Sequence, residues 1–333
     1  MNQVIELSKK DRAHYEAFHN EAVSPDLHQS WEWGTFQQKV PGRGPVWRFA
    51  ALDTEDKWVS TVQVIKYALP FGLCWLSVVR GPLYQEDLAL EDLHAAIQSL
   101  GKKEKAVFIR YEWPRDVSPT LKKEWKRAHA YYQPRWTLLV DLKDSEEETL
   151  AQMKPKGRYN IKVARKKGVT VRETSNPKDV AAFYQVLKKT GGRDGFSIHS
   201  ESYYQDFIMA GSKGEWASLF VSEYEGQVIG GILATFFGDT ATYYYGASDH
   251  AHRKVMAPYL TQWTVMQTAK ERGYKTYDFL GIAPPNEPKH PWVGITQFKC
   301  KFGGQQFKYG VPQEWVLKPF WYFLIKLRKR LRR

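Results

Sequence analysis

The sequence predicts an α/β protein in which two domains repeat one plan, each built on a mixed β-sheet. The chain has 333 residues, which is enough for two domains that each bury a core of ordinary size. Strand-like runs alternate with helix-like runs in both halves. In each half the order is the same: strands joined by tight turns, then a helix, then a buried strand. This repeat indicates duplication of one α/β unit.

The first half begins with a polar stretch, 9–22, that predicts a helix. A segment rich in indole and amide groups follows at 28–38, and in it Gln37 is a candidate to point into a groove. Strand-like runs come next, separated by turn signals. In order, the remaining elements are strands at 46–54, 57–69 and 73–84, a helix at 87–102, and strands at 106–113 and 137–143.

The second half repeats this order, with a turn at Glu225-Gly226 between its first two strands. The plan is that of the acetyltransferase-like (GNAT-type) fold. We expect a first domain at 1–143, joined by a C-terminal helix within 313–333, and a second domain at 144–312. The expected elements of the second half are strands at 218–224, 228–238 and 240–248, a helix at 258–272 and a buried strand at 275–282.

The join between the halves predicts two short helices. Ser145 and Glu148 fit a capping box for the first, and Pro155 suits the first turn of the second. Four basic residues share one face of the second helix. Like charges stacked in this way repel, which favours an anionic partner, although a merely solvated basic face explains the pattern equally well. The four are Arg158, Lys162, Arg165 and Lys166.

A lysine-bearing segment near the end of the second half is the main candidate for chemistry. Alternation along an extended segment would put Lys299 and Lys301 on one side and Phe298 and Phe302 on the other. Spacing alone favours a solvated face of a surface strand. The alternative is a cation at the mouth of a cleft, where it steadies an oxyanion or a phosphate.

Composition excludes several classes of protein. Hydrophobic residues make up 43% of the chain and aromatic residues 15%, as in a well-packed protein rather than a disordered one. The start, MNQVIELSKKDR, lacks the apolar stretch of a secretory signal, and the apolar runs are shorter than the roughly 20 residues of a membrane span. We therefore expect a cytoplasmic protein. Two cysteines and scattered histidines show no metal-ligand spacing.

The net charge of +13 predicts an anionic partner: nucleic acid, anionic lipid headgroups or phosphorylated small molecules. The tail, 319–333, is aromatic and aliphatic first and basic at its end. We expect its apolar face to pack on the first domain while its cations rest on an anionic bilayer surface. The apolar residues on this one helical face are Phe320, Phe323, Leu324, Leu327 and Leu331.

Four segments in order resemble the Fem family of aminoacyl-tRNA-dependent transferases, which build peptidoglycan cross-bridges. They are SVVRGPLY at 77–84, the basic-helix segment at 140–171, YYYGASDHAHRKVMAPYLTQW followed by YDFLGIAP, and the FK pair at 298–299. The resemblance covers nearly the whole chain, most clearly 137–310. Because the second domain lacks a long charged insertion, the chain is similar to compact members without a coiled-coil arm.

This resemblance implies that an amino acid esterified to tRNA passes to an amine on the stem peptide of lipid II or of a UDP-linked muropeptide. It makes Lys299 the residue that stabilises the oxyanion, with Phe298 beside it. Glu112 aligns with an aspartate proposed as a base, and it either orients the amine or is only a satisfied carboxylate. The basic helix would contact tRNA or phosphate. The resemblance also implies no metal and no cofactor. We expect a monomer, on the inner face of the cytoplasmic membrane if the acceptor is lipid-linked.

The acceptor site departs from the family at two positions. Gln37 aligns with a lysine that contacts nucleotide phosphates, although Lys39 is nearby, and His199 stands where an arginine is expected, while Tyr203 is kept. These departures favour lipid II over a soluble acceptor. The substrate-contact candidates are Gln37, Lys39, His199, Tyr203, Arg253 and Met256.

Two alternatives share the fold. An acyl-CoA-dependent transferase needs small residues in the phosphate loop before its helix, and here Met256 and Pro258 stand there, which argues against CoA. An aminoacyl-tRNA-dependent transferase that acts on a protein or small-molecule amine is harder to separate by sequence. Transfer of label from charged tRNA to each acceptor would discriminate between them.

Overall fold

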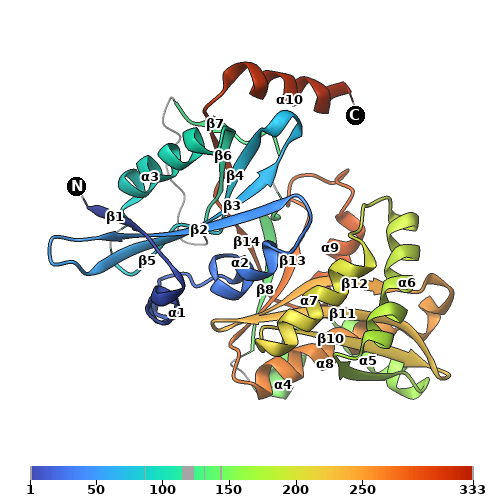
Figure 1. The fold of residues 1–333 in the computed structure, drawn as a ribbon. Helices are drawn as coiled ribbons and strands as arrows, with labels where there is room; N and C mark the ends of the chain where they lie inside the picture. The colour runs from blue at the N-terminus through green and yellow to red at the C-terminus, as the bar shows by residue number, and fades with distance from the viewer. Residues whose placement is uncertain (1, 87, 115–123, 131, 143–144, 332–333) are drawn as a thin grey trace. The chain divides into compact units, whose positions relative to one another are not determined.

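The computed structural model describes residues 2–86, 88–114, 124–130, 132–142 and 145–331. The chain forms two compact units, each with its own sheet (Figure 1). The first unit joins Met1–Arg135 to Tyr309–Arg333, and the second unit is Trp136–Lys308. Within the described residues, no helix is long and apolar enough to cross a membrane.

The first unit is built on an eight-stranded mixed sheet. Its strands are β1 (Gln3–Glu6), β2 (Arg43–Leu52), β3 (Trp58–Ala68), β4 (Cys74–Val79), β5 (Leu83–Tyr84), β6 (Ala106–Glu112), β7 (Lys126–Arg127) and β15 (Gln313–Val316), and its helices are α1 (Arg12–Glu21), α2 (Trp31–Gln37), α3 (Leu90–Lys103) and α10 (Pro319–Leu331). The strand order is β1-β2-β3-β4-β6-β15-β7, with β5 paired to β3. Strands β4 and β6 run parallel because α3 returns the chain between them.

The second unit has a seven-stranded mixed sheet. Its strands are β8 (Trp136–Asp141), β9 (Thr170–Thr174), β10 (Ala217–Tyr224), β11 (Gln227–Phe237), β12 (Thr240–Ser248), β13 (Thr276–Gly281) and β14 (Gln305–Lys308), and its helices are α4 (Glu146–Gln152), α5 (Pro155–Lys166), α6 (Pro177–Asp194), α7 (Glu201–Lys213), α8 (Ala257–Glu271) and α9 (Val293–Lys299). The strand order is β14-β8-β13-β12-β11-β10-β9. Here β12 and β13 run parallel, with α8 between them.

The two sheets repeat one plan. Both have a meander of three antiparallel strands, β2-β3-β4 and β10-β11-β12, followed by one helix and a parallel strand. The predicted fold class, two tandem GNAT-type α/β domains with mixed sheets, is confirmed, and α10 returns to the first unit as expected. The second core gathers around β13 and α8, where Trp263, Tyr277 and Phe279 are fully buried.

Three expectations from the sequence differ from the structure. Strand β8 pairs with β13 and β14 in the second sheet, so the expected boundary at residue 143 falls one strand too late. The FK segment is not extended: α9 ends at Lys299, and a 3-10 turn, η5 (Cys300–Phe302), follows. The sequence patterns predict none of β9, α6 and α7, which the structure contains.

The tail helix packs through a face other than the expected one. Trp321, Tyr322 and Ile325 join an aromatic cluster on the first sheet with Trp75 and Phe108. The five apolar residues expected to pack there lie on the opposite side of the helix. Four of them, Phe320, Phe323, Leu327 and Leu331, are exposed. The helix thus has apolar residues on two sides, and the sequence pattern does not tell which side will pack.

Candidate active site around Lys299

The ammonium of Lys299 lies inside the second unit. The residue is only 6% exposed, although it ends a short helix, α9. Its Nζ donates a hydrogen bond of 2.7 Å to the carbonyl oxygen of Gly281 and lies 5.2 Å from the centre of the Tyr243 ring. Among the described residues, Gly281 O is the one hydrogen-bond acceptor of this ammonium, which leaves N–H groups for a further acceptor.

Two neighbouring strands part at this position. Strands β12 and β13 pair only from Thr240 to Thr242, so both lose their shared ladder at Tyr243. Leu280 has a φ of 56°, and the register of β13 against β8 shifts between Asp278 and Gly281. A bulge of this kind turns backbone groups out of the ladder. The Gly281 carbonyl is thereby free to accept from Lys299, which contacts one strand through Tyr243 and the other through Gly281.

Burial lowers the pKa of Lys299 to about 8, and this is opposed in part by the nearby carboxylate of Asp278. Asp278 is itself buried, where it accepts from the Thr137 hydroxyl and from the Leu280 N–H at 2.7 Å. The lysine is thus mostly protonated near neutral pH. A positive charge in such a poorly solvated place stabilises a developing oxyanion far more than one in water.

One neighbour of Lys299, Phe298, was expected from the sequence, and two others, Tyr243 and Asp278, were not. Phe298 is half-buried and packs edge-on against Tyr259 at 5.1 Å between ring centres, so it holds α9 onto the core. The sequence analysis assigned no role to Tyr243 or Asp278. An aspartate inside an otherwise apolar buried strand, YDFLG, is the signal that could have found Asp278.

His199 and Tyr203 form a second group that adjoins the same strand, β12. Their rings stack with centres 3.9 Å apart. The Tyr203 hydroxyl lies 3.2 Å from that of Tyr245, which is on β12 two residues after Tyr243. The structure thus brings both predicted second-domain groups, Lys299 and the His199–Tyr203 pair, into contact with β12.

Two of the three predicted residues of the first unit, Glu112 and Gln37, are buried and already hydrogen-bonded within that unit. Both carboxylate oxygens of buried Glu112 accept backbone N–H groups, from Tyr132 at 2.8 Å and Gln133 at 2.7 Å. This favours the satisfied carboxylate over the amine-orienting group. Gln37 is buried at the end of α2, where its oxygen accepts from Arg43 at 2.5 Å, whereas Lys39 is exposed.

The basic face of α5 keeps three of its four predicted members. Lys162, Arg165 and Lys166 are exposed. Arg158 instead turns back to the end of α4, where its guanidinium donates to the carbonyls of Leu150, Ala151 and Met153. It thus caps the free carbonyl groups of a helix end. Exposed Tyr159 lies among the remaining cations, which the sequence analysis did not single out.

The loop before α8 does not form a glycine-type phosphate cradle. Met256 has a φ of 60°, and its N–H is directed to the Arg253 carbonyl, while Pro258 has no N–H to offer. Arg253 is exposed, and its guanidinium reaches the His250 carbonyl at 3.3 Å. A pyrophosphate needs several free N–H groups at such a helix start. Among the described residues, no three His, Cys, Asp or Glu side chains gather as metal ligands.

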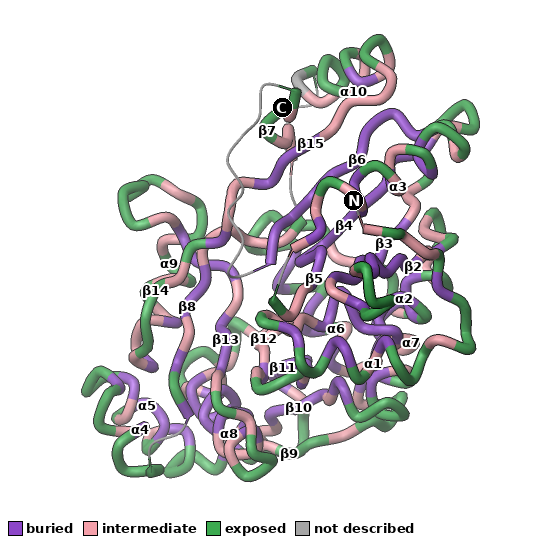
Figure 2. Tube along the Cα trace, turned by 90° about the vertical axis from the view of Figure 1, so that its left-hand side faces the viewer, coloured by how far each residue is buried: buried purple, intermediate pink, exposed green. Residues whose placement is uncertain are grey.

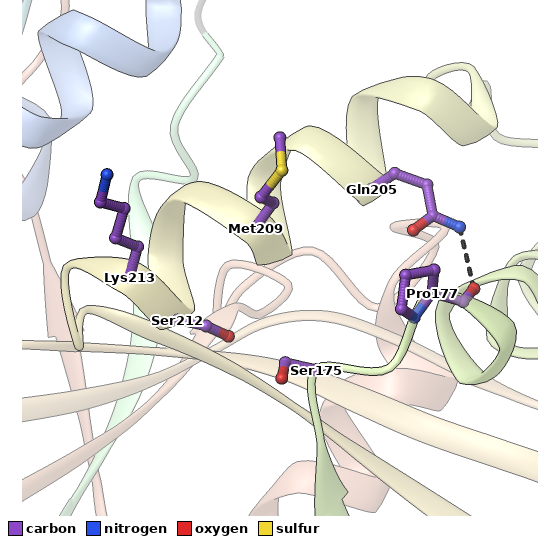
Figure 3. Close-up of a pocket in the computed structure, with 6 residues that line it drawn as sticks. All are labelled: Ser175, Pro177, Gln205, Met209, Ser212 and Lys213. Atoms are coloured by element: carbon purple, nitrogen blue, oxygen red, sulfur yellow. Dashed lines mark hydrogen bonds between the residues drawn. The ribbon is translucent and has the colours of Figure 1, made fainter.

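A pocket of about 450 Å³ lies elsewhere on the second unit, beside α7 and the start of α6 (Figure 3). Gln205 closes one side of it, with a hydrogen bond of 3.0 Å to the Pro177 carbonyl. Its lining residues lie on the side of α7 away from Tyr203, and none is a predicted site residue. The lining comprises Ser175, Pro177, Gln205, Met209, Ser212 and Lys213.

Comparison with known proteins first defines the class. Residues 155–299 match the acetyltransferase (GNAT) domain family, a match that ends at Lys299. A tandem GNAT protein from the clavulanic acid biosynthesis pathway is similar in fold, with a TM-score of 0.60 at 13% identity over 94% of this chain and 98% of that one. The chain thus has a tandem GNAT-type fold.

The chain is more similar still in structure to FemX, and in sequence it is similar to lipid II:glycine glycyltransferases. A crystal structure of FemX has a TM-score of 0.83 at 20% identity, over 97% of this chain and all of that one. Lipid II:glycine glycyltransferase of Staphylococcus saprophyticus is 24% identical over 88% of each chain. That of Staphylococcus haemolyticus is 25% identical over 71% of this chain and 74% of its own. The resemblance to the Fem family expected from the sequence is confirmed.

Proposed function

We propose that the protein transfers an amino acid from aminoacyl-tRNA to an amine on the stem peptide of lipid II and so forms a cross-bridge peptide bond of peptidoglycan. The observation that carries this proposal is the buried ammonium of Lys299, held where β12 and β13 part. The named activity of similar proteins, glycyl transfer to lipid II, supports the choice of acceptor.

In the proposed reaction, the acceptor nitrogen attacks the ester carbonyl of the aminoacyl-tRNA. The new N–C bond creates a tetrahedral oxyanion, which the Lys299 ammonium stabilises. The C–O bond to the ribose then breaks, and the proton lost by the nitrogen ends on the released ribose hydroxyl. Removal of a single such donor from an oxyanion site typically costs 100- to 1000-fold in turnover, so we expect a loss on the order of 100-fold for Lys299→Met.

The two substrates occupy different features. We assign the tRNA to the exposed cations of α5, and the amine end of the acceptor to the surroundings of His199 and Tyr203. We further propose that the protein acts as a monomer at the inner face of the cytoplasmic membrane, where lipid II presents its stem peptide. Arg253 and Met256, in the turn before α8, are candidates for contact with the donor.

The test follows label from a charged tRNA to lipid II, to a UDP-linked muropeptide and to a protein amine. Lys299→Met is compared with the matched variant Lys301→Met, whose lysine lies two residues on and bonds the Tyr259 hydroxyl at 2.9 Å. We expect transfer to lipid II, loss of transfer in Lys299→Met and retention in Lys301→Met. Label on the protein amine alone, or transfer only from acyl-CoA, would establish the alternative N-acyltransferase.

A further inference from the structure

Helix α10 turns an apolar side outward. Its inner side packs on the first unit through Trp321 and Ile325. Two hydrogen bonds add to this contact: the Tyr322 hydroxyl donates to Glu314 at 2.5 Å, and Lys329 Nζ donates to the His129 carbonyl at 3.3 Å. The orientation of the helix is therefore set. On the opposite side the exposed fractions are Phe320 67%, Phe323 61%, Leu327 41% and Leu331 80%.

A fifth exposed apolar residue lies beside α10, from another part of the first unit. Phe71 is 84% exposed at the tip of the turn η3 (Pro70–Gly72) between β3 and β4, with a φ of 63°. Its ring centre lies 5.6 Å from that of Trp321 on α10. Figure 1 shows α10 beside the end of this hairpin. We name Phe71, Phe320, Phe323, Leu327 and Leu331 the apolar ridge.

The charges of α10 itself have one sign. Lys326 and Arg328 are exposed on α10 on either side of it. From Trp315 to Arg333 the sequence contains no aspartate or glutamate. An outward row of Phe and Leu flanked by cations is the arrangement by which a helix lies in the interface of an anionic bilayer.

We propose that the apolar ridge inserts into the surface of an anionic phospholipid bilayer, with the cations of α10 on the headgroups. This deepens the proposed function, on which its biological purpose rests, by naming the surface that brings the enzyme to a lipid-linked acceptor. Long phenyl and leucyl side chains enter the boundary between headgroups and acyl chains, and a residue at a hairpin tip extends that contact beyond one helix.

The test measures binding of the full chain to vesicles of phosphatidylcholine, alone or mixed equally with phosphatidylglycerol. We expect binding to the mixed vesicles, weaker by roughly tenfold or more without the anionic lipid or in high salt. Phe320→Ser with Phe323→Ser should weaken binding by about tenfold or more, and Phe71→Ser by several-fold. The matched control is Met209→Ser, an equally exposed apolar residue on α7 of the second unit, which should bind as the unchanged protein does.

Several results would overturn the proposal. One is equal binding by the ridge variants and the unchanged protein, and another is no vesicle binding at all. A third is a dimer in solution that the Phe320→Ser and Phe323→Ser changes convert to monomer, since the ridge would then be a contact between copies. The variant with Phe320→Ser and Phe323→Ser should keep the thermal unfolding midpoint, because both side chains are more than half exposed.

Failure of the proposed function would look different. With a water-soluble stem-peptide amine as acceptor, the ridge variants should transfer label as well as the unchanged protein, and they should lose transfer only to lipid II in vesicles. A protein that binds anionic vesicles through the ridge but transfers no label to either acceptor would contradict the proposed function and leave this inference standing.

Discussion

A lysine ammonium that is 6% exposed is costly to the protein that buries it. Lys299 receives one hydrogen bond partner and a buried carboxylate near it, and its pKa still falls to about 8. Such a lowered pKa means that the folded protein holds this proton less tightly than the unfolded chain does. Stability has therefore been given up at this position, as is common where a charge serves chemistry.

The stability cost has a defined dependence on pH. Below pH 8 the lysine is protonated in both states, and the folded state bears the full cost of burying the charge. Between about 8 and 10.5 it is neutral when folded and still protonated when unfolded, so stability rises with pH. We expect the free energy of unfolding of Lys299→Met to exceed that of the unchanged protein by about 1–3 kcal/mol at neutral pH. The difference should shrink as pH rises through this window. Urea unfolding at several pH values measures both.

A constant gap at all pH values would show that packing, not charge, separates the two proteins. The same variant is expected to lose activity, so gain of stability and loss of turnover would occur together. A lysine with a purely structural role would give the opposite result, since its removal would weaken the fold.

Gly246 lies against the Tyr243 ring, which is part of the Lys299 site. A Cβ at this position of β12 would overlap the hydroxyl and ring of Tyr243, which lies beneath the ammonium. We expect Gly246→Ala to displace that ring and lower turnover by tenfold or more while the protein stays folded. The matched control is Gly192→Ala in α6, where an added Cβ meets nothing within 4 Å. That change should leave turnover alone and stabilise by about 0.5–1 kcal/mol, as alanine does inside helices. Equal turnover in both variants would separate Tyr243 from catalysis.

The four cations predicted on one face of helix α5 do not share one role in the structure. Lys162 and Lys166 are free to meet a phosphate backbone, whereas Arg158 caps α4. We expect Lys162→Ala with Lys166→Ala to weaken binding of charged tRNA and to lower the slope of log affinity against log salt by about 1–2. Filter binding across a salt series measures this, with Lys178→Ala, an exposed lysine on α6, as control.

Arg158→Ala should behave in the reverse way. It removes the donor from three carbonyls at the end of α4, so we expect a loss of roughly 1–2 kcal/mol of stability with an unchanged salt slope. Equal effects of the two substitutions on the salt slope would return Arg158 to the proposed tRNA-binding face.

The elements themselves show where sequence patterns stop being informative. The capping box at Ser145 and Glu148 formed as predicted, because all its bonds lie within four residues. The spacing of Phe298 and Phe302 does not distinguish a helix from a strand, because residues four apart lie on one side of both. The site around Lys299 was found only in part, because its contacts with Tyr243 and Gly281 join residues that lie far apart in the chain.

For the whole molecule, the duplicated plan was predictable and the path of the chain between the units was not. The turn between β2 and β3 and the turn between β10 and β11 show the repeat in local sequence. Strand β8, however, follows the first unit directly and enters the second sheet, while β15 follows the second unit and enters the first. Apolar alternation predicts the strand at 137–143, but not which sheet will supply its hydrogen bonds, and no strand was expected at Gln313–Val316.

This path makes the second unit an insertion with adjoining ends. Trp136 and Lys308 are paired residues of β8 and β14, and in the first unit the N–H of Tyr309 donates 2.8 Å to the carbonyl of Arg135. We therefore expect residues 136–308 to fold alone. We also expect the first unit to fold when Arg135 is joined to Tyr309 by a short glycine-containing turn, because closing so small a gap costs little chain entropy.

Cooperative thermal unfolding of each fragment, followed by circular dichroism, measures this. The matched comparison is the fragment 144–312, cut at the boundary that the sequence suggested. It lacks β8, the strand that pairs with both β13 and β14, so the ladders on both sides of that strand are lost and the apolar side chains of Leu138 and Val140 leave the core. That fragment should be unfolded or aggregate, since a sheet opened in its interior exposes two edges. If 144–312 unfolded as cooperatively as 136–308, β8 would be dispensable to the second unit, and the insertion boundary at 135–136 would be wrong.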